Sequence, residues 1–273
     1  MDCVAIIPAR HHSVRLPGKL LASLAGRPMI QHVVECCLRV DGVRRVVVAT
    51  DHVEIAAAAQ AAGADTCLTP SDLPSGTDRV AAAAQDYPSE IILNVQGDEP
   101  LLDPGELGRA LSAFHSDGCD FGTLRSPLRE SRDLWDANVV KVVTDCEGRA
   151  LYFTRGPAPF PKAEWIGAGA GRPEAGAIGV GGRIVFANAP ELPGPYAVHV
   201  GVYFYRRAGL VRWARLEPST LERVEGLEQL RLLEAGEVIR TYEVVASHPG
   251  VNTKEDLERV RAVLEGGQAD GRE

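Results

Sequence analysis

Residues 4 to 21 read Val4-Ala5-Ile6-Ile7-Pro8-Ala9-Arg10-His11-His12-Ser13-Val14-Arg15-Leu16-Pro17-Gly18-Lys19-Leu20-Leu21, and this stretch decides the fold. It begins as a short apolar run suited to a buried strand, which we expect to end at Pro8. The loop that follows carries three cations, Arg10, Arg15 and Lys19, and no acidic residue. Turn amides, a planar Arg fork and a compact Lys charge suit phosphate oxygens. A solvated basic loop is the alternative, and charge alone does not decide between them.

Four β-α repeats occupy the first hundred residues. Further strands are predicted at 43–50, 65–69 and 90–95, and helices near residues 27, 51 and 75. The segment Asp51-His52-Val53-Glu54 has the pattern of a capping box that opens the second helix. This alternation predicts an α/β, Rossmann-like fold, with a mostly parallel sheet and helices on both faces. In the common strand order 3-2-1-4, the cationic loop and Asp98 would lie in one crevice.

The second half of the chain predicts a smaller, mixed β sub-architecture. A hairpin is expected over 139–154, a strand over 199–206, a helix over 225–235 and a strand over 238–246. Thr253 and Asp256 are expected to cap a final helix, with a frayed tail over 266–273. The run Gly167–Gly171 follows no strand and lacks dinucleotide-binding spacing, so we interpret residues 156–197 as a loop.

Composition limits the class of protein. The 273 residues, 45% of them hydrophobic, suit a single domain over 1–265, made of a nucleotide-binding half (1–126) and a second half (127–265). A net charge of −8 argues against a nucleic-acid or membrane partner. There is no apolar run of about 20 residues and no basic leader, so we expect a cytoplasmic protein. The six cysteines lack CxxC spacing, which favours buried thiols over disulfides or zinc.

The cationic loop also carries a family resemblance. Its pattern Ile7-Pro8-Ala9-Arg10-x-x-Ser13-x-Arg15-Leu16-Pro17-Gly18-Lys19 resembles the opening signature of the sugar-acid cytidylyltransferases, above all the CMP-Kdo synthetases and more distantly the CMP-sialic acid synthetases. The family usually has Gly where this chain has His12. A Walker A motif is excluded because Gly18-Lys19-Leu20 lacks both the upstream glycine and the following Ser or Thr. The resemblance extends from residue 4 to about residue 264.

The resemblance implies a reaction and a nucleotide site. The family transfers CMP from CTP to the anomeric 2-hydroxyl of Kdo, giving CMP-Kdo and pyrophosphate for lipopolysaccharide biosynthesis, and it forms homodimers. The matching catalytic residues are Arg10, Lys19 and Asp98. The matching nucleotide-binding residues are Pro8, Ala9, Arg10, Arg15, Lys19, Ser75, Gly76, Arg79 and Gln96. Taken alone, Ser75-Gly76-Thr77-Asp78 is also a helix N-cap, and both interpretations hold together.

The resemblance also implies a sugar-acid site and a Mg²⁺ ion. The matching sugar-acid residues are Gln96, Arg155, His199, Tyr203, Glu228 and Gln229. Arg suits a carboxylate, and His, Glu and Gln suit hydroxyls, although a lone His beside a strand is more often structural. Asp98, in Gln96-Gly97-Asp98-Glu99-Pro100, matches the magnesium-binding aspartate. Asn252 stands where the family has a second metal-binding aspartate, and a simple helix cap is its alternative role.

Two alternative functions stay open from the sequence. One is a cytidylyltransferase for a related acid sugar, such as 8-amino-Kdo or sialic acid. The other is a non-catalytic nucleotide-binding module that has kept the fold and lost turnover. In the first case the partners are CTP and an acid sugar, and in the second CTP alone, so pyrophosphate release separates them.

Overall fold

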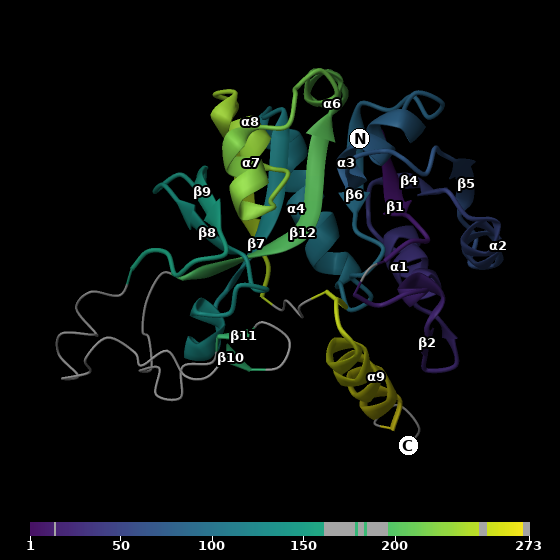
Figure 1. Ribbon diagram of the computed structural model, residues 1–273. Helices are drawn as coiled ribbons and strands as arrows, with labels where there is room; N and C mark the ends of the chain where they lie inside the picture. Colours follow the sequence, from purple (N-terminus) through teal and green to yellow (C-terminus); the bar gives the residue numbers. More distant parts are fainter. Residues whose placement is uncertain (14, 161–177, 180–182, 185–195, 246–249, 270–273) are drawn as a thin grey trace. The chain divides into compact units, whose positions relative to one another are not determined.

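The computed structural model describes residues 1–13, 15–160, 178–179, 183–184, 196–245 and 250–269 (Figure 1). The chain forms two compact units that interleave along the sequence. The first comprises Met1–Gly122, Gly201–Arg215 and Ala246–Glu273, and the second comprises Thr123–Val200 and Leu216–Val245. Strand β12 (Ala197–Arg206) contributes its first residues to the second unit and the rest to the first.

A parallel sheet forms the centre of the first unit. Its strands β1 (Cys3–Ala9), β4 (Val43–Thr50), β5 (Asp65–Leu68) and β6 (Ile91–Val95) lie in the order β6-β1-β4-β5. This is the predicted order 3-2-1-4, which is therefore confirmed. Residues 202–206 of β12 pair antiparallel with β6. All seven residues of β1 are buried, as expected for a central parallel strand.

Pro8 lies inside β1, so the prediction that the strand ends there is wrong. Pro8 pairs with Ala49 and Ala9 with Thr50 of β4. The register with β6 runs only from Cys3 to Ile6. Proline has no N–H to donate, and it is tolerated at position 8 because β1 no longer pairs with β6 there.

The first unit also contains helices. They are α1 (Met29–Leu38), α2 (Val53–Ala61), α3 (Gly76–Ala83), α4 (Pro104–Asp117), α6 (Arg207–Trp213) and α9 (Lys254–Ala269). Of these, α3, α4 and α9 begin at a side-chain cap. Ser75 caps α3, as predicted, and Asp103 caps α4. Thr253 and Asp256 exchange hydrogen bonds of 2.9 and 3.1 Å at the start of α9, which confirms that capping box. Helix α9 continues to Ala269, so the tail predicted to fray from residue 266 is helical up to that point.

The capping box predicted at Asp51 is wrong. The N-cap of α2 is His52, and it makes no side-chain cap hydrogen bond. The carboxylate of Asp51 instead accepts from the backbone N–H of His11 and from Arg79. The Asp51 side chain therefore bonds to partners distant in sequence and, contrary to the prediction from the local pattern, does not cap the helix.

Between β1 and α1 the chain forms the one-turn helix η1 (Lys19–Leu21) and the short pair β2 (Ser23–Leu24) and β3 (Arg27–Pro28). Gly18 precedes η1 with φ 68°, a left-handed conformation that favours glycine. This glycine therefore sets the turn that presents Lys19.

The second unit contains the predicted hairpin, β8 (Lys141–Thr144) and β9 (Ala150–Thr154). Its other elements are β7 (Phe121–Pro127, which begins in the first unit), η2 (Ser131–Leu134), α7 (Thr220–Glu225), α8 (Leu230–Glu234), β13 (Ile239–Glu243) and the short pair β10 (Ile178–Gly179) and β11 (Arg183–Ile184). The single helix predicted over 225–235 is wrong, because Gly226 ends α7 at φ 64° before α8 begins. Most of the loop predicted over 156–197, including Gly167–Gly171, lies outside the described residues.

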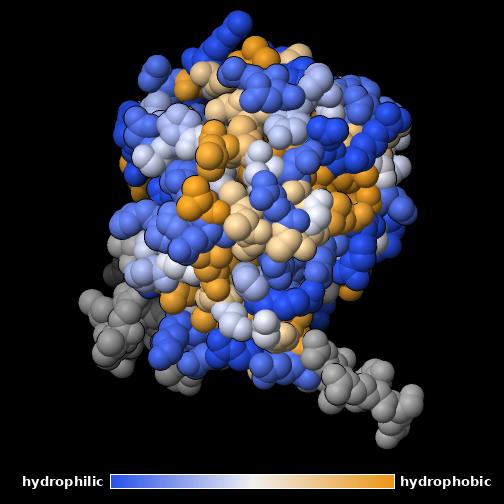
Figure 2. All heavy atoms as spheres, turned by 90° about the vertical axis from the view of Figure 1, so that its right-hand side faces the viewer, coloured by the Kyte–Doolittle hydropathy of each residue, from blue (hydrophilic) through white to orange (hydrophobic). Residues whose placement is uncertain are grey.

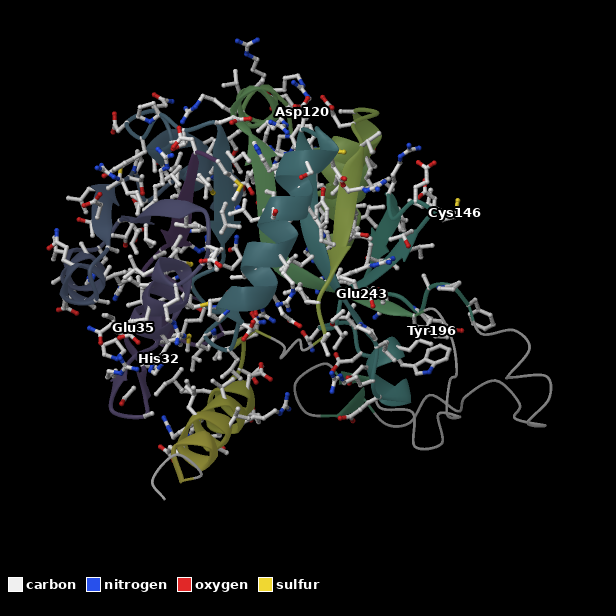
Figure 3. The ribbon with its side chains drawn as sticks, turned by 180° about the vertical axis from the view of Figure 1, so that it is seen from behind. His32, Glu35, Asp120, Cys146, Tyr196 and Glu243 are labelled. Carbon is white, nitrogen blue, oxygen red and sulfur yellow. The ribbon has the colours of Figure 1, made fainter. Side chains whose placement is uncertain are left out.

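The surface and the cysteines agree in part with expectation. Figure 2 shows one face of the molecule, on which apolar residues form separate patches among hydrophilic ones. Cys3, Cys36 and Cys37 are buried thiols, and burial raises the pKa of Cys36 to about 11. Cys146 is exposed on the turn between β8 and β9, contrary to the prediction (Figure 3). Within the described residues, no helix is both long enough and apolar enough to cross a bilayer.

Candidate functional site

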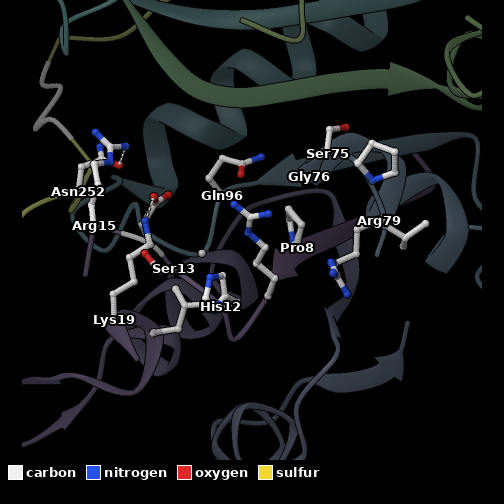
Figure 4. Close-up of a pocket in the computed structure, with 16 residues that line it drawn as sticks. Pro8, His12, Ser13, Arg15, Lys19, Ser75, Gly76, Arg79, Gln96 and Asn252 are labelled. Carbon is white, nitrogen blue, oxygen red and sulfur yellow. Dashed lines mark hydrogen bonds and ion pairs between the residues drawn. The ribbon is translucent and has the colours of Figure 1, made fainter. Parts of the chain in front are cut away.

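A pocket of about 350 Å³ lies in the first unit, where the cationic loop follows β1 and the Gln96–Asp98 turn follows β6 (Figure 4). Parallel strands end at the same edge of a sheet, so their C-terminal loops meet there. All but one of the predicted nucleotide and metal residues line it: Pro8, Arg10, Arg15, Lys19, Ser75, Gly76, Arg79, Gln96, Asp98 and Asn252. The exception, Ala9, is buried at the end of β1. Figure 4 shows Arg15, Lys19 and Asn252 at one end and Ser75, Gly76 and Arg79 at the other.

Lys19 and Asp98 form an ion pair at the first end of the pocket. The Nζ atom of Lys19 lies 2.5 Å from Oδ2 of Asp98 and donates to the carbonyl oxygen of Val251 at 3.2 Å. Both charged side chains are largely buried, so solvent screens their attraction less than at an open surface. The pair therefore places a cation of the loop and a hard carboxylate in direct contact.

Arg15 binds Asn252 beside this pair. The guanidinium Nη2 donates to Oδ1 of Asn252 at 2.8 Å. The backbone N–H of Asn252 donates to Asp256 at 3.1 Å, and its side-chain amide donates to Gly250 O at 3.2 Å. The side-chain oxygen of Asn252 thus points to the pocket, while Thr253 caps α9.

Gly76 brings the start of α3 close to Gln96 at the other end. A Cβ atom at position 76 would lie 3.2 Å from Oε1 of Gln96 and 3.6 Å from Cγ of Pro8. Gln96 is itself oriented by a 3.0 Å hydrogen bond from its Nε2 to Asn94. The glycine at position 76 therefore lets the start of α3 approach the Gln96 side chain closely.

Arg79 is a buried cation in the pocket wall. Its side chain is 2% exposed, and it donates to Thr69 Oγ1 and, at 3.4 Å, to Asp51 Oδ2. Burial lowers the pKa of Arg79, Asp51 opposes that change and the positive charge of Arg10 adds to it. Arginine keeps its proton in such a setting, so the pocket contains fixed positive charge.

The donor set fits a magnesium ion that shares its coordination with a substrate. Asp98 offers a carboxylate and Asn252 a neutral amide oxygen, both on the pocket wall. No cluster of three or more His, Cys, Asp or Glu side chains suited to a metal occurs in the described part of the chain. Magnesium commonly takes one or two protein carboxylates and completes its shell with water and phosphate oxygens. A metal held mainly by substrate therefore fits these residues better than an all-protein cage.

Glu99 lies next to Asp98 and was not predicted as a site residue. Burial, and then the negative charge of Asp98, raise the pKa of Glu99 well above its usual range. Its carboxylate packs closely on glycine backbone, because a Cβ at Gly250 would lie 2.9 Å from Oε1 and one at Gly201 3.2 Å from it. The adjacent carboxyls of the Asp98-Glu99 pair were the available signal in the sequence.

Arg155, predicted for the sugar acid, lies in the second unit, and backbone carbonyls surround its guanidinium. Nε donates to Glu225 O at 2.7 Å, Nη1 to Ala137 O at 2.8 Å and Nη2 to Gly226 O at 3.3 Å. Its backbone N–H donates to the Glu225 carboxylate at 2.9 Å. Arg155 therefore joins the end of β9 to the end of α7.

His199 also lies in the second unit, as do Glu228 and Gln229 just before α8. Nε2 of His199 lies 2.9 Å from Oγ1 of Thr123, and its ring meets Phe153 edge-on at 5.1 Å. Burial lowers the pKa of His199 to about 3, so the ring is neutral at pH 7. Gln96 and Tyr203, the other predicted sugar-acid residues, belong to the first unit.

Lys141 is a structural residue that the sequence analysis missed. Its side chain is fully buried, and Nζ donates to the carbonyl oxygens of Asp136 (2.9 Å), Val139 (2.7 Å) and Arg155 (2.7 Å). Burial lowers the pKa of Lys141 to about 8. The signal was a lone cation within the apolar run Val139-Val140-Lys141-Val142-Val143.

The chain is similar to characterised cytidylyltransferases over nearly its whole length. The profile of the Cytidylyltransferase family matches residues 4–239. The 3-deoxy-manno-octulosonate cytidylyltransferases of Geobacter sulfurreducens and Trichlorobacter lovleyi are 44% and 42% identical to it, over 95% and 98% of this chain and 98% and 100% of theirs. A solved structure of CMP:2-keto-3-deoxy-manno-octonic acid synthetase complexed with CTP aligns with a TM-score of 0.82 and 38% identity, covering 98% of this chain and all of that one. A Leptospira borgpetersenii cytidylyltransferase shares the fold, with a TM-score of 0.58 over 97% of this chain and 87% of that one, at 15% identity.

Proposed function

The chain belongs to the cytidylyltransferase family and, within it, to the 3-deoxy-manno-octulosonate cytidylyltransferases, and we propose that it transfers CMP from CTP to the anomeric 2-hydroxyl of Kdo. The products are CMP-Kdo, for lipopolysaccharide biosynthesis, and pyrophosphate. One observation carries the assignment to this site. The cations Arg10, Arg15 and Lys19 share a single pocket with Asp98 and with the Ser75–Gly76 helix start.

In the reaction, the 2-hydroxyl oxygen of Kdo attacks the α-phosphorus of CTP. The new P–O bond forms as the bond to the bridging oxygen of the β-phosphate breaks, and the hydroxyl proton is released. Catalysis of this kind depends on positioning and on offsetting negative charge, because no protein nucleophile is needed. Arg10, Arg15 and Lys19 supply that positive charge, and the Arg side chains also orient phosphate oxygens.

Asp98 and Asn252 are the residues that would hold Mg²⁺. When bound, the ion supplies further positive charge to the phosphates. The ammonium of Lys19 is paired with the Asp98 carboxylate in this structure. When the substrates bind, this ion pair must break so that Lys19 can bind phosphate. The Arg15–Asn252 hydrogen bond holds the amide oxygen in place for the ion.

The base and the sugar acid are assigned to separate groups of residues. Ser75, Gly76 and Gln96 form the cytosine end, where a helix N-terminus offers N–H groups to the base. Gln96 and Tyr203 of the first unit are assigned to the sugar acid. Within the second unit, His199, Glu228 and Gln229 stay candidates from the resemblance, whereas the guanidinium of Arg155 is taken by backbone carbonyls. A neutral His199 suits a hydroxyl group, since neutral imidazole both donates and accepts hydrogen bonds. The enzyme is proposed to act as a cytoplasmic homodimer.

Pyrophosphate release by the purified protein tests this function. Wild-type protein, Mg²⁺ and each of CTP, UTP and ATP would be combined with Kdo, 8-amino-Kdo or N-acetylneuraminic acid. We expect release with CTP and Kdo at a kcat/KM at least about tenfold above that for any other pair. A preference for another acid would reassign the substrate. Lack of release with every acid, together with measurable CTP binding, would identify a non-catalytic nucleotide-binding module.

A further inference from the structure

Asp51 binds two separate elements of the nucleotide pocket without lining it. It directly follows β4, and its side chain is 10% exposed. Oδ1 accepts from the backbone N–H of His11 at 2.8 Å, and Oδ2 accepts from Nη2 of Arg79 at 3.4 Å. Each carboxylate oxygen therefore has a partner from a different part of the chain.

These two partners belong to different elements that line the pocket. His11 lies in the cationic loop between Arg10 and His12, both of which line the pocket. Arg79 lies on α3, whose N-cap Ser75 also lines it. The carboxylate of Asp51 thus connects the loop that faces phosphate with the helix that faces the base.

Other contacts keep both connections in place. The Oγ1 atom of Thr69, which accepts from Arg79, donates to the carbonyl oxygen of Thr50 at 3.2 Å, one residue before Asp51. The ring of His11 stacks on that of His52 at 3.7 Å, one residue after Asp51. The end of β4 therefore anchors both the cationic loop and α3.

Charge gives Asp51 a second effect on the same geometry. Arg79 and Arg10 are both positive and repel each other, and Asp51 offsets this repulsion at Arg79. A neutral residue at position 51 would leave a buried guanidinium facing another cation, which costs free energy and favours movement of the two apart. Both the hydrogen bonds and the charge of Asp51 thus hold the cationic loop and α3 at a fixed distance from each other.

We propose that Asp51 is a positioning residue that fixes the spacing between the cationic loop and α3, so that one cytidine triphosphate binds both at once. This inference rests on the proposed function for the identity of the nucleotide. Connected half-sites bind a ligand that spans them more tightly than independent half-sites do, because the second contact becomes intramolecular. Loss of the connection should therefore weaken the binding of a ligand that spans both elements and leave the binding of its separate fragments unchanged.

The test compares Asp51→Asn with wild type, using full-length protein and three probes. CTP spans the pocket, inorganic tripolyphosphate reaches only the cationic loop, and cytidine reaches only the base end. Binding would be measured by calorimetry for the two phosphates and by NMR titration for cytidine. We expect the Kd of CTP to rise about tenfold or more, and the Kd of each fragment to change by less than about threefold. Asp86→Asn, at an exposed position in the same unit, is the control and should leave all three unchanged.

A second pair of variants cuts the same connection from the other side, in case Asp51→Asn does not fold. His11→Pro removes the N–H that Asp51 accepts, whereas His11→Ala keeps it and removes only the ring. We expect His11→Pro to show the selective loss of CTP affinity, and His11→Ala, which loses only the stacking on His52, to show a smaller loss. Unchanged CTP binding in the folded variants, or equal weakening of CTP and tripolyphosphate, would overturn the proposal. All readouts are binding constants, so failure of the wild-type protein to release pyrophosphate would refute the proposed reaction separately.

Discussion

The Nζ atom of Lys19 lies 2.5 Å from the Oδ2 atom of Asp98, which joins the loop after β1 to the turn after β6. These residues are 79 positions apart in the sequence. Each offsets the other's charge until a triphosphate and a metal provide new partners. Because the proposed function assigns Lys19 to phosphate and Asp98 to the metal, variants at either position test that assignment directly.

The first prediction concerns the cations of the pocket. Lys19→Ala and Arg10→Ala each remove a positive charge that faces the triphosphate, so we expect the KM for CTP to rise by about tenfold or more in each. Steady-state kinetics with CTP varied would measure this. Arg44→Ala removes an exposed cation of the same unit and is the matched control. Unchanged CTP constants in both pocket variants, with normal thermal unfolding, would contradict the placement of the loop.

The second prediction concerns Asp98→Asn. An amide is a poorer magnesium ligand than a carboxylate, so we expect kcat to fall by a factor on the order of a hundred or more, with nucleotide binding retained. The variant also frees Lys19 from its ion pair, which favours binding of the triphosphate. Pyrophosphate release at saturating Mg²⁺ is the measurement. Activity within a few-fold of wild type would remove Asp98 from the metal site.

The third prediction concerns Asn252. A carboxylate at this position would add negative charge beside the metal, so Asn252→Asp should lower the Mg²⁺ concentration for half-maximal rate several-fold. Asn252→Ala removes the oxygen that Arg15 binds, and we expect it to raise the Mg²⁺ concentration for half-maximal rate. Rates measured across a magnesium titration compare the two. If both variants keep the magnesium dependence and acid preference of wild type, Asn252 lies outside the chemistry.

The fourth prediction follows from the buried imidazole of His199. Its pKa falls from 6.5 in an unfolded chain to about 3 in the folded one. Below pH 6.5 the unfolded state therefore binds more protons, and stability that is fully present above that pH is lost as the pH falls toward 3. Between pH 7 and 5 we expect wild type to lose on the order of 2 kcal/mol more unfolding free energy than His199→Gln. Urea unfolding at the two pH values measures this, and parallel losses would show that His199 does not carry the effect.

Much of the first unit was predictable because its signals are local and repeated. Apolar runs of strand length alternate with capped helices, and short connections between them allow few topologies. The order β6-β1-β4-β5 then brings Lys19 and Asp98 to one crevice. The site residues came from the family resemblance, and the pocket gathers all the predicted nucleotide and metal residues except Ala9.

The errors share a physical cause, which is competition from partners distant in sequence. Asp51 fits a capping box, yet His11 and Arg79, at separations of 40 and 28 residues, bind its carboxylate instead. Lys141 was missed because its partners, three backbone carbonyl oxygens, become its neighbours only in the folded chain. Gly226, which divides α7 from α8, is a local signal that was overlooked.

The central claim is that this pocket joins CTP to Kdo. Its most direct test is ³¹P NMR of wild-type protein incubated with CTP, Mg²⁺ and Kdo, and of the same mixture without Kdo. The account predicts that pyrophosphate and CMP-Kdo accumulate in equal amounts, and that both are absent when Kdo is omitted. No product in the complete mixture, or pyrophosphate formed at the same rate without Kdo, would contradict it.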